Sequence, residues 1–131
     1  MNYSTSPTYE VKLWTGSVRG YNGKKFLLKT LLNKISDFQK GREDSISLAV
    51  TPTTFIFKDY IEEGWEIAAR NYPRFPQPPE KIDDFMMRLA QYLLVELEQN
   101  RITISDAENS VTLESDTAEE HPKPKKGKKY E

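Results

Sequence analysis

The sequence predicts an α+β fold in which an antiparallel sheet has two amphipathic helices packed on one of its faces. Apolar residues recur at helical spacing in two stretches, about 24–40 and about 79–99. Around these stretches, apolar and polar residues alternate as they do in half-buried strands. A chain of 131 residues is long enough to form one domain with a core of its own.

The chain divides into a flexible arm at 1–7, a single α+β domain at 8–114 and a disordered charged tail at 115–131. The tail is assigned on composition, which changes there to Asp, Glu, Pro, Gly and Lys. Its basic run at 123–129 is interpreted as a solubilising terminus rather than as a nucleic-acid-binding segment.

The first strand is expected over 8–14, where Tyr9, Val11 and Leu13 alternate with polar residues. A second extended piece is expected over 17–21. The pattern leaves two alternatives open, because this piece is either the second strand of a hairpin or the continuation of one strand through a glycine bulge.

The first helix is expected over about 24–40, with Gly41 at the position that a C-terminal cap requires. Its apolar stripe consists of Leu28, Leu31, Leu32, Ile35 and Phe38. The lysines of this segment lie mostly off the stripe, and we interpret them as a solvated face.

Three successive antiparallel strands are expected next, at 45–51, 54–60 and 65–71. Pro52 is expected to end the first of them, since proline has no donor for a central strand. A turn at 62–64 is expected to separate the second strand from the third.

The second helix is expected to open at Pro78-Pro79-Glu80, because proline is tolerated in a first turn and an acid there favours the helix dipole. Its stripe, which extends to about Gln99, consists of Ile82, Phe85, Met86, Leu89, Leu93 and Leu97. Alternating segments at 101–105 and 110–114 then predict a terminal hairpin.

Between the third strand and the second helix lies a proline-rich segment, Asn71 to Pro79, which we call the proline loop. Its prolines make it a stiff extended segment that presents Tyr72, Arg74 and Phe75 at little entropic cost. Aromatic faces and a guanidinium suit stacking on a base and binding a phosphate. The alternative interpretation is that the aromatic side chains merely close one end of the core.

Composition narrows the class of protein. The chain has no cysteine, which excludes disulfides and thiolate chemistry. A net charge of -1 argues against a nucleic-acid partner, and no apolar run is long enough for a membrane span. The N-terminal residues lack the pattern of a signal peptide, and a chain without cysteine fits a reducing cytoplasm, so a cytoplasmic location is expected.

The sequence offers no recognisable catalytic centre. The one histidine, His121, lies in the tail, and no nucleophile-elbow, Walker or dinucleotide-binding motif is present. The carboxylate pairs Glu62/Glu63 and Asp83/Asp84 are explained by a turn and by a helix start. We therefore expect no catalytic residues, no metal site and no cofactor, with a carboxylate-only Mg²⁺ site as the alternative left open.

A family resemblance follows from the proline loop and the segment after the second helix. The loop begins Asn-Tyr-Pro-Arg-Phe-Pro at Asn71, a long amphipathic helix follows, and Gln-Asn-Arg-Ile at 99–102 opens the terminal hairpin. This arrangement resembles the first described family of phage Thoeris anti-defence proteins over roughly residues 8–114.

The resemblance implies a non-enzymatic sponge that sequesters a cyclic ADP-ribose signal made by bacterial TIR proteins. It implies a homo-oligomer with the ligand pockets at its interfaces. By the same resemblance, Phe75 would stack on the ligand and Arg101 would bind its phosphates. Asn71 and Arg74 would assist, and Tyr72 lies in the same loop.

Two other classes of function remain open at this stage. The first is a phage-type interaction module that inhibits a host enzyme through its surface. The second is a nucleic-acid-binding accessory protein that uses the aromatic loop, the lysines of the first helix and the tail, and it predicts a steep dependence of binding on salt.

Overall fold

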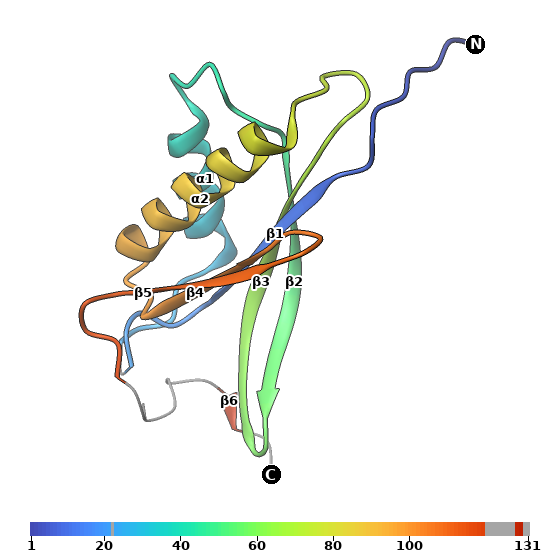
Figure 1. The fold of residues 1–131 in the computed structure, drawn as a ribbon. Helices are drawn as coiled ribbons and strands as arrows, with labels where there is room; N and C mark the ends of the chain where they lie inside the picture. The colour runs from blue at the N-terminus through green and yellow to red at the C-terminus, as the bar shows by residue number, and fades with distance from the viewer. Residues whose placement is uncertain (22, 120–127, 130–131) are drawn as a thin grey trace.

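The computed structural model describes residues 1–21, 23–119 and 128–129. Its strands form one antiparallel sheet with the spatial order β2-β3-β1-β4-β5, and the short β6 pairs with β3 (Figure 1). The elements are β1 (Glu10–Gly16), α1 (Leu28–Gln39), β2 (Leu48–Phe57), β3 (Tyr60–Arg70), α2 (Pro79–Glu96), β4 (Arg101–Ser105), β5 (Ser110–Glu114) and β6 (Lys128–Lys129). The predicted α+β fold is confirmed.

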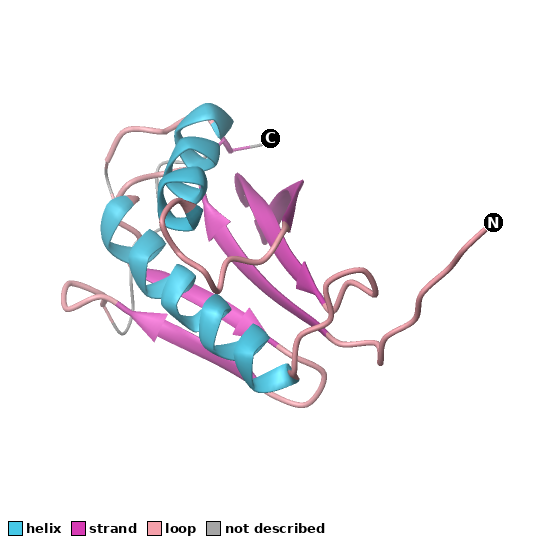
Figure 2. Ribbon diagram, turned by 90° about the horizontal axis from the view of Figure 1, so that it is seen from above, coloured by secondary structure: helices cyan, strands magenta, loops and turns pink. Residues whose placement is uncertain are grey.

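Both helices lie on the same side of the sheet, and the other face is open (Figure 2). The hydrophobic core lies between the helices and the sheet, and most of the apolar stripe of α2 is buried in this core. Fully buried side chains on α2 and the adjoining turn are Ile82, Phe85, Met86, Leu89, Leu93 and Leu97. Helix α1 adds Leu31 and Ile35, with Phe38 partly buried beside them. The stripe predicted for α2 is buried as expected, whereas Leu28 and Leu32 of the stripe predicted for α1 are 41% and 43% exposed.

Strand β1 is the centre of the sheet, with β3 on one side and β4 on the other. Alternate side chains of a strand point to opposite faces. Val11 and Leu13 are buried under the helices, whereas Trp14 lies on the open face opposite Glu66 of β3 and Thr103 of β4.

The three-strand meander expected over 45–71 is wrong, because β2 and β3 form one long hairpin. Pro52 does not end a strand: β2 is an edge strand, where a missing donor costs no ladder hydrogen bond. The turn lies at Lys58, which has a positive φ of 57°. The segment expected as a turn at 62–64 is therefore inside β3.

Helix α1 begins at Leu28, about one turn later than expected. The residues before it fold back on the segment after β1, where Val18 makes an isolated antiparallel bridge with Lys25. The amide of Phe26 donates to the carbonyl of Ser17 at 2.8 Å, and its ring packs against Trp65 at 5.5 Å. Tertiary packing of Phe26 thus replaces the first predicted helical turn.

The proline loop is held by Asn71, which is 9% exposed. Its side-chain nitrogen donates to the carbonyl of Pro7 at 2.9 Å, and its side-chain oxygen accepts the amide of Gln77 at 2.9 Å. Asn71 therefore ties the N-terminal arm and the loop to the end of β3.

No helix in the described ranges is long and apolar enough to cross a membrane. The tail expected over 115–131 falls mostly outside the described residues. Its first part, 115–119, is described and contacts the rest of the domain, as set out below.

Candidate functional site

The open face of the sheet carries a hollow of about 300 Å³, which we call the open-face hollow. It is lined by Trp14, Gly16, Phe55, Glu62, Arg101 and Thr103. These residues come from β1, β2, β3 and β4, so the β2–β3 hairpin and two strands distant from it in sequence contribute to one site. The lining combines two aromatic rings, one carboxylate and one guanidinium.

Glu62 is the central charged group of this hollow and is only 5% exposed. One carboxylate oxygen accepts the amide of Ser17 at 2.8 Å, and the other accepts the hydroxyl of Tyr60 at 3.1 Å. Across residues 1–21, 23–119 and 128–129, no lysine or arginine is ion-paired with Glu62. A buried carboxylate with donors but no cation is a favourable place for a cationic ligand group.

Two glycines make room for the side chains of Glu62 and Phe55. Gly16 and Gly64 are paired across β1 and β3, and both lie on the open face. A Cβ at Gly16 would overlap with the Glu62 carboxylate, and one at Gly64 would meet the Phe55 ring at 2.6 Å. The hollow therefore depends on the absence of side chains at this pair.

Tyr60 acts as a fixed donor to Glu62. Burial raises the pKa of the Tyr60 hydroxyl, and the negative charge of Glu62 raises it further. Tyr60 therefore remains protonated at neutral pH and keeps its hydrogen bond to the carboxylate.

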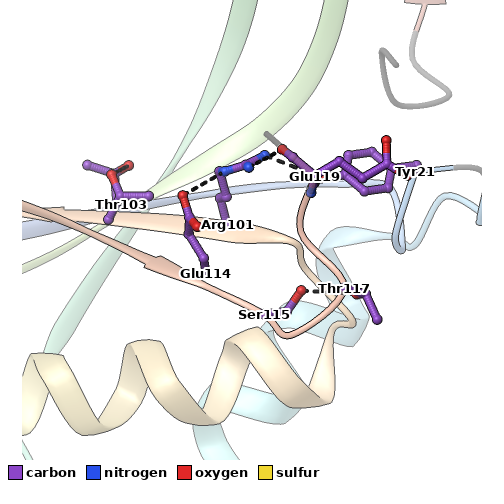
Figure 3. Close-up of polar contacts among 8 residues, drawn as sticks. Tyr21, Arg101, Thr103, Glu114, Ser115, Thr117 and Glu119 are labelled. Carbon is purple, nitrogen blue, oxygen red and sulfur yellow. Dashed lines mark hydrogen bonds and ion pairs between the residues drawn. The ribbon is translucent and has the colours of Figure 1, made fainter. Parts of the chain in front are cut away.

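Arg101 forms the opposite wall, where its guanidinium makes three contacts (Figure 3). Its Nε donates to Glu114 at 3.1 Å, one Nη donates to the Tyr21 hydroxyl at 3.3 Å, and the other donates to the carbonyl of Glu119. The bond to Glu114 is the main cause of a raised pKa for Arg101. The amide of Glu119 also donates to Tyr21 at 2.7 Å, so the segment 115–119 packs against this arginine.

Arg101 does not cap the C-terminal end of α2. The carbonyl of Glu96, in the last turn of α2, instead accepts Nη1 of Arg19 at 3.1 Å. Arg101 is therefore directed to the open face and the segment after β5.

The structure does not bring the predicted ligand-binding residues together. Arg101 lines the open-face hollow at the Gly16 end of β1. The proline loop follows Arg70, which pairs with Glu10 at the other end of β1, roughly 20 Å away at the usual rise of a strand. Phe75 is 69% exposed there, with the Arg74 guanidinium 5.4 Å from its ring.

Sequence reasoning missed Glu62, Trp14 and Phe55. Glu62 was assigned to a turn because Glu62-Glu63-Gly64 has the composition of one. Only a weak signal was present: Ile61 falls in the alternating register of Trp65, Ile67 and Ala69, but Glu63 interrupts that register. The exposed carboxylate pair was in fact one buried acid, Glu62, and one ion-paired acid, Glu63, which contacts Lys25 at 2.7 Å.

The fold is an open-faced α+β sandwich with a polar and aromatic site on its uncovered sheet, and it is similar to two solved structures. The first is a phage SAM lyase in complex with S-methyl-5'-thioadenosine, with a TM-score of 0.67 and 10% identity over 91% of this chain and 98% of that chain. The second is a phage SAM lyase in the apo state, with a TM-score of 0.57 and 10% identity over 85% of this chain and 92% of that chain. No protein-family model matches the sequence, and no curated protein sequence matches it either.

The resemblance to the Thoeris anti-defence family is therefore wrong, and so is the cyclic ADP-ribose sponge that it implied. The fold is instead similar to that of two phage SAM lyase structures, and this finding also contradicts the expectation of a non-enzymatic protein. The physical reason is that the matched motif is short and local. Its two principal residues, Phe75 and Arg101, lie at opposite ends of the sheet.

Proposed function

We propose that this chain is a SAM lyase, which binds S-adenosylmethionine and cleaves it to release S-methyl-5'-thioadenosine. The observation that carries the proposal is the buried Glu62 carboxylate in a hollow that also presents two aromatic rings and an arginine. The similarity of the fold to a SAM lyase that holds S-methyl-5'-thioadenosine supports the choice of substrate.

The substrate's charges match the open-face hollow. S-adenosylmethionine carries a positive sulfonium, and a desolvated carboxylate such as Glu62 attracts a cation more strongly than an exposed one. The faces of Trp14 and Phe55 add cation–π attraction. The amino-acid end of the substrate carries a carboxylate, for which Arg101 is the matching partner.

The proposed reaction breaks the bond between the sulfonium sulfur and the aminobutyrate carbon. The bonding electron pair moves to sulfur, which becomes a neutral thioether and leaves without needing a proton. As that bond breaks, either the substrate's own carboxylate forms a bond to the carbon, giving a lactone, or the neighbouring carbon loses a proton, giving an alkene. Glu62 is the group placed to accept that proton in the second route, and the amino-acid product distinguishes the two routes.

We also propose that the chain works as a homo-oligomer in the cytoplasm of a phage-infected bacterium. The β2–β3 hairpin projects beyond the rest of the sheet (Figure 1). Near its tip, Phe55, Ile56 and Phe57 are 36%, 67% and 74% exposed. Phe55 and Phe57 lie on one face of β2 and Ile56 on the other, so both faces of the hairpin near its tip expose apolar side chains of the kind that mark association surfaces. Loss of S-adenosylmethionine in such a cell deprives the methyl-dependent host systems, defence included, of their methyl donor.

The test is to incubate the purified full chain with about 1 mM S-adenosylmethionine, near the upper end of common KM values, and to follow the nucleoside by chromatography. We expect S-methyl-5'-thioadenosine to accumulate. S-adenosylhomocysteine is the matched control, because it lacks the sulfonium charge and is expected to stay intact. If the chain neither cleaves S-adenosylmethionine nor binds it in calorimetry at this concentration, the proposal is overturned.

A further inference from the structure

A second hollow, of about 740 Å³, lies beside the first. It is enclosed by the end of α2, the segment that follows β1 and the turn that follows β5. Its lining includes Tyr21, Leu94, Glu98, Asn100, Glu114 and Thr117. We call it the Asn100 hollow.

Asn100 has hydrogen-bonding capacity that the protein does not use. Its residue is 3% exposed, and its side-chain nitrogen has no partner in the described ranges of the chain. Its side-chain oxygen has only a long contact of 3.5 Å with the Thr117 hydroxyl. A buried polar group without a partner is costly, so its persistence calls for an explanation.

The neighbouring Gln99 provides the contrast. It is 1% exposed, and its side-chain nitrogen donates to the carbonyls of Val18 at 2.9 Å and Leu97 at 3.1 Å. Gln99 thus secures the turn after α2, whereas the amide of Asn100 has no such structural task.

The unused groups define the ligand chemistry. A carboxamide offers one donor and one acceptor side by side, which is the complement of an adenine edge with its amino group and adjacent ring nitrogen. Among the charged groups that line the hollow, Glu98 is ion-paired with Arg19 at 3.2 Å and Glu114 with Arg101 at 3.1 Å. Asp116 adds a further negative charge, so the lining favours a neutral base over an anion. Tyr21 adds an aromatic ring to the lining, as base-binding sites commonly do.

Arg101 connects the two hollows. It lines the open-face hollow, and its guanidinium is bonded to Glu114 and Tyr21, which both line the Asn100 hollow (Figure 3). One ligand can therefore place its charged end near Glu62 and its base beside Asn100.

We propose that the Asn100 hollow receives the adenine ring of the substrate, with the Asn100 carboxamide hydrogen-bonded to the adenine amino group and an adjacent ring nitrogen. The Thr117 hydroxyl, now at 3.5 Å, gives way to the base. This inference rests on the proposed function, since that function supplies the adenosyl ligand.

The first test compares calorimetric binding of S-methyl-5'-thioadenosine with that of S-methyl-5'-thioinosine, in which a carbonyl replaces the amino group. Wild type is expected to prefer the adenine compound about tenfold or more, the worth of about one buried hydrogen bond. Asn100→Leu, which removes both polar atoms at similar size, is expected to abolish the preference. Asn33→Leu, at an exposed position on α1, is the matched control and should retain it.

Melting curves separate a ligand contact from a structural one. Because the Asn100 nitrogen has no partner, Asn100→Leu is expected to melt at the same temperature as wild type or higher. A lower melting temperature with the preference intact would assign Asn100 a structural role and overturn the inference.

A measurement on wild type removes any dependence on variants. With ¹⁵N-asparagine labelling, the side-chain signal of Asn100 is expected to shift downfield when S-methyl-5'-thioadenosine is added. An unshifted signal at saturating ligand, or equal affinity for the two nucleosides, would overturn the inference while leaving cleavage of S-adenosylmethionine in place. Absence of both cleavage and nucleoside binding would overturn the proposed function itself.

Discussion

The two ends of β1 carry similar kinds of side chain, but only those at the Gly16 end line the open-face hollow. At the Glu10 end, both polar atoms of the Asn71 side chain have hydrogen-bond partners, in Pro7 and Gln77, while Phe75 projects into solvent. At the Gly16 end, Glu62 is buried, and no lysine or arginine of the described ranges is ion-paired with it. The difference lies in the buried polar groups, because the Glu62 charge has no ion-pair partner and the Asn100 nitrogen has no hydrogen-bond partner in the described ranges.

The largest effect is expected for Glu62→Gln, which keeps the side-chain volume and removes the charge. We expect kcat/KM for S-adenosylmethionine to fall by about 10²–10³, the usual scale for loss of a key electrostatic group in a site. The assay is initial-rate release of S-methyl-5'-thioadenosine. Glu66→Gln, on the same face but already paired with Lys12 at 3.4 Å, is the control and should keep near wild-type activity.

The two arginines give the next comparison. Arg101→Lys retains the positive charge but loses the planar fork that binds a carboxylate in two places, so KM is expected to rise about tenfold. Arg74→Lys, in the proline loop, is expected to leave KM unchanged. Equal rises in both variants would show that the loop contributes to the site after all.

A smaller effect, on stability alone, is expected for Asn71→Ala. The change removes two hydrogen bonds at a buried position, and we expect the free energy of unfolding to fall by about 1–3 kcal/mol. Urea denaturation measures this loss, with Asn33→Ala on the outer face of α1 as the control. Unchanged stability would mean that the loop is held by its prolines rather than by Asn71.

The smallest effect is expected for Phe75→Ala. Its ring is 69% exposed, so the free energy of unfolding should change by less than about 0.5 kcal/mol. Calorimetry with S-methyl-5'-thioadenosine should give wild-type affinity. That Phe75, Tyr72 and the rest of the loop bind a ligand stays a prediction, and a clear loss of affinity here would support it.

Local periodicity was enough to determine much of the fold. The apolar stripe from Ile82 to Leu97 and the prolines before it predicted α2, and the alternation at 101–105 and 110–114 predicted the hairpin β4–β5. Together with the stripe of α1, these patterns indicated an antiparallel sheet covered by helices on one face. Such features depend on neighbours within a few residues of the sequence, so a sequence contains them directly.

Pairing between distant segments was decided only by the tertiary structure. Pro52 is tolerated because β2 lies at the edge of the sheet, and no local pattern reports that position. Glu62 is buried because Gly16, on a different strand, leaves space for its carboxylate and Ser17 supplies a donor. By itself the sequence determined which residues form helices and strands, whereas strand order and register determined which of their side chains share a site.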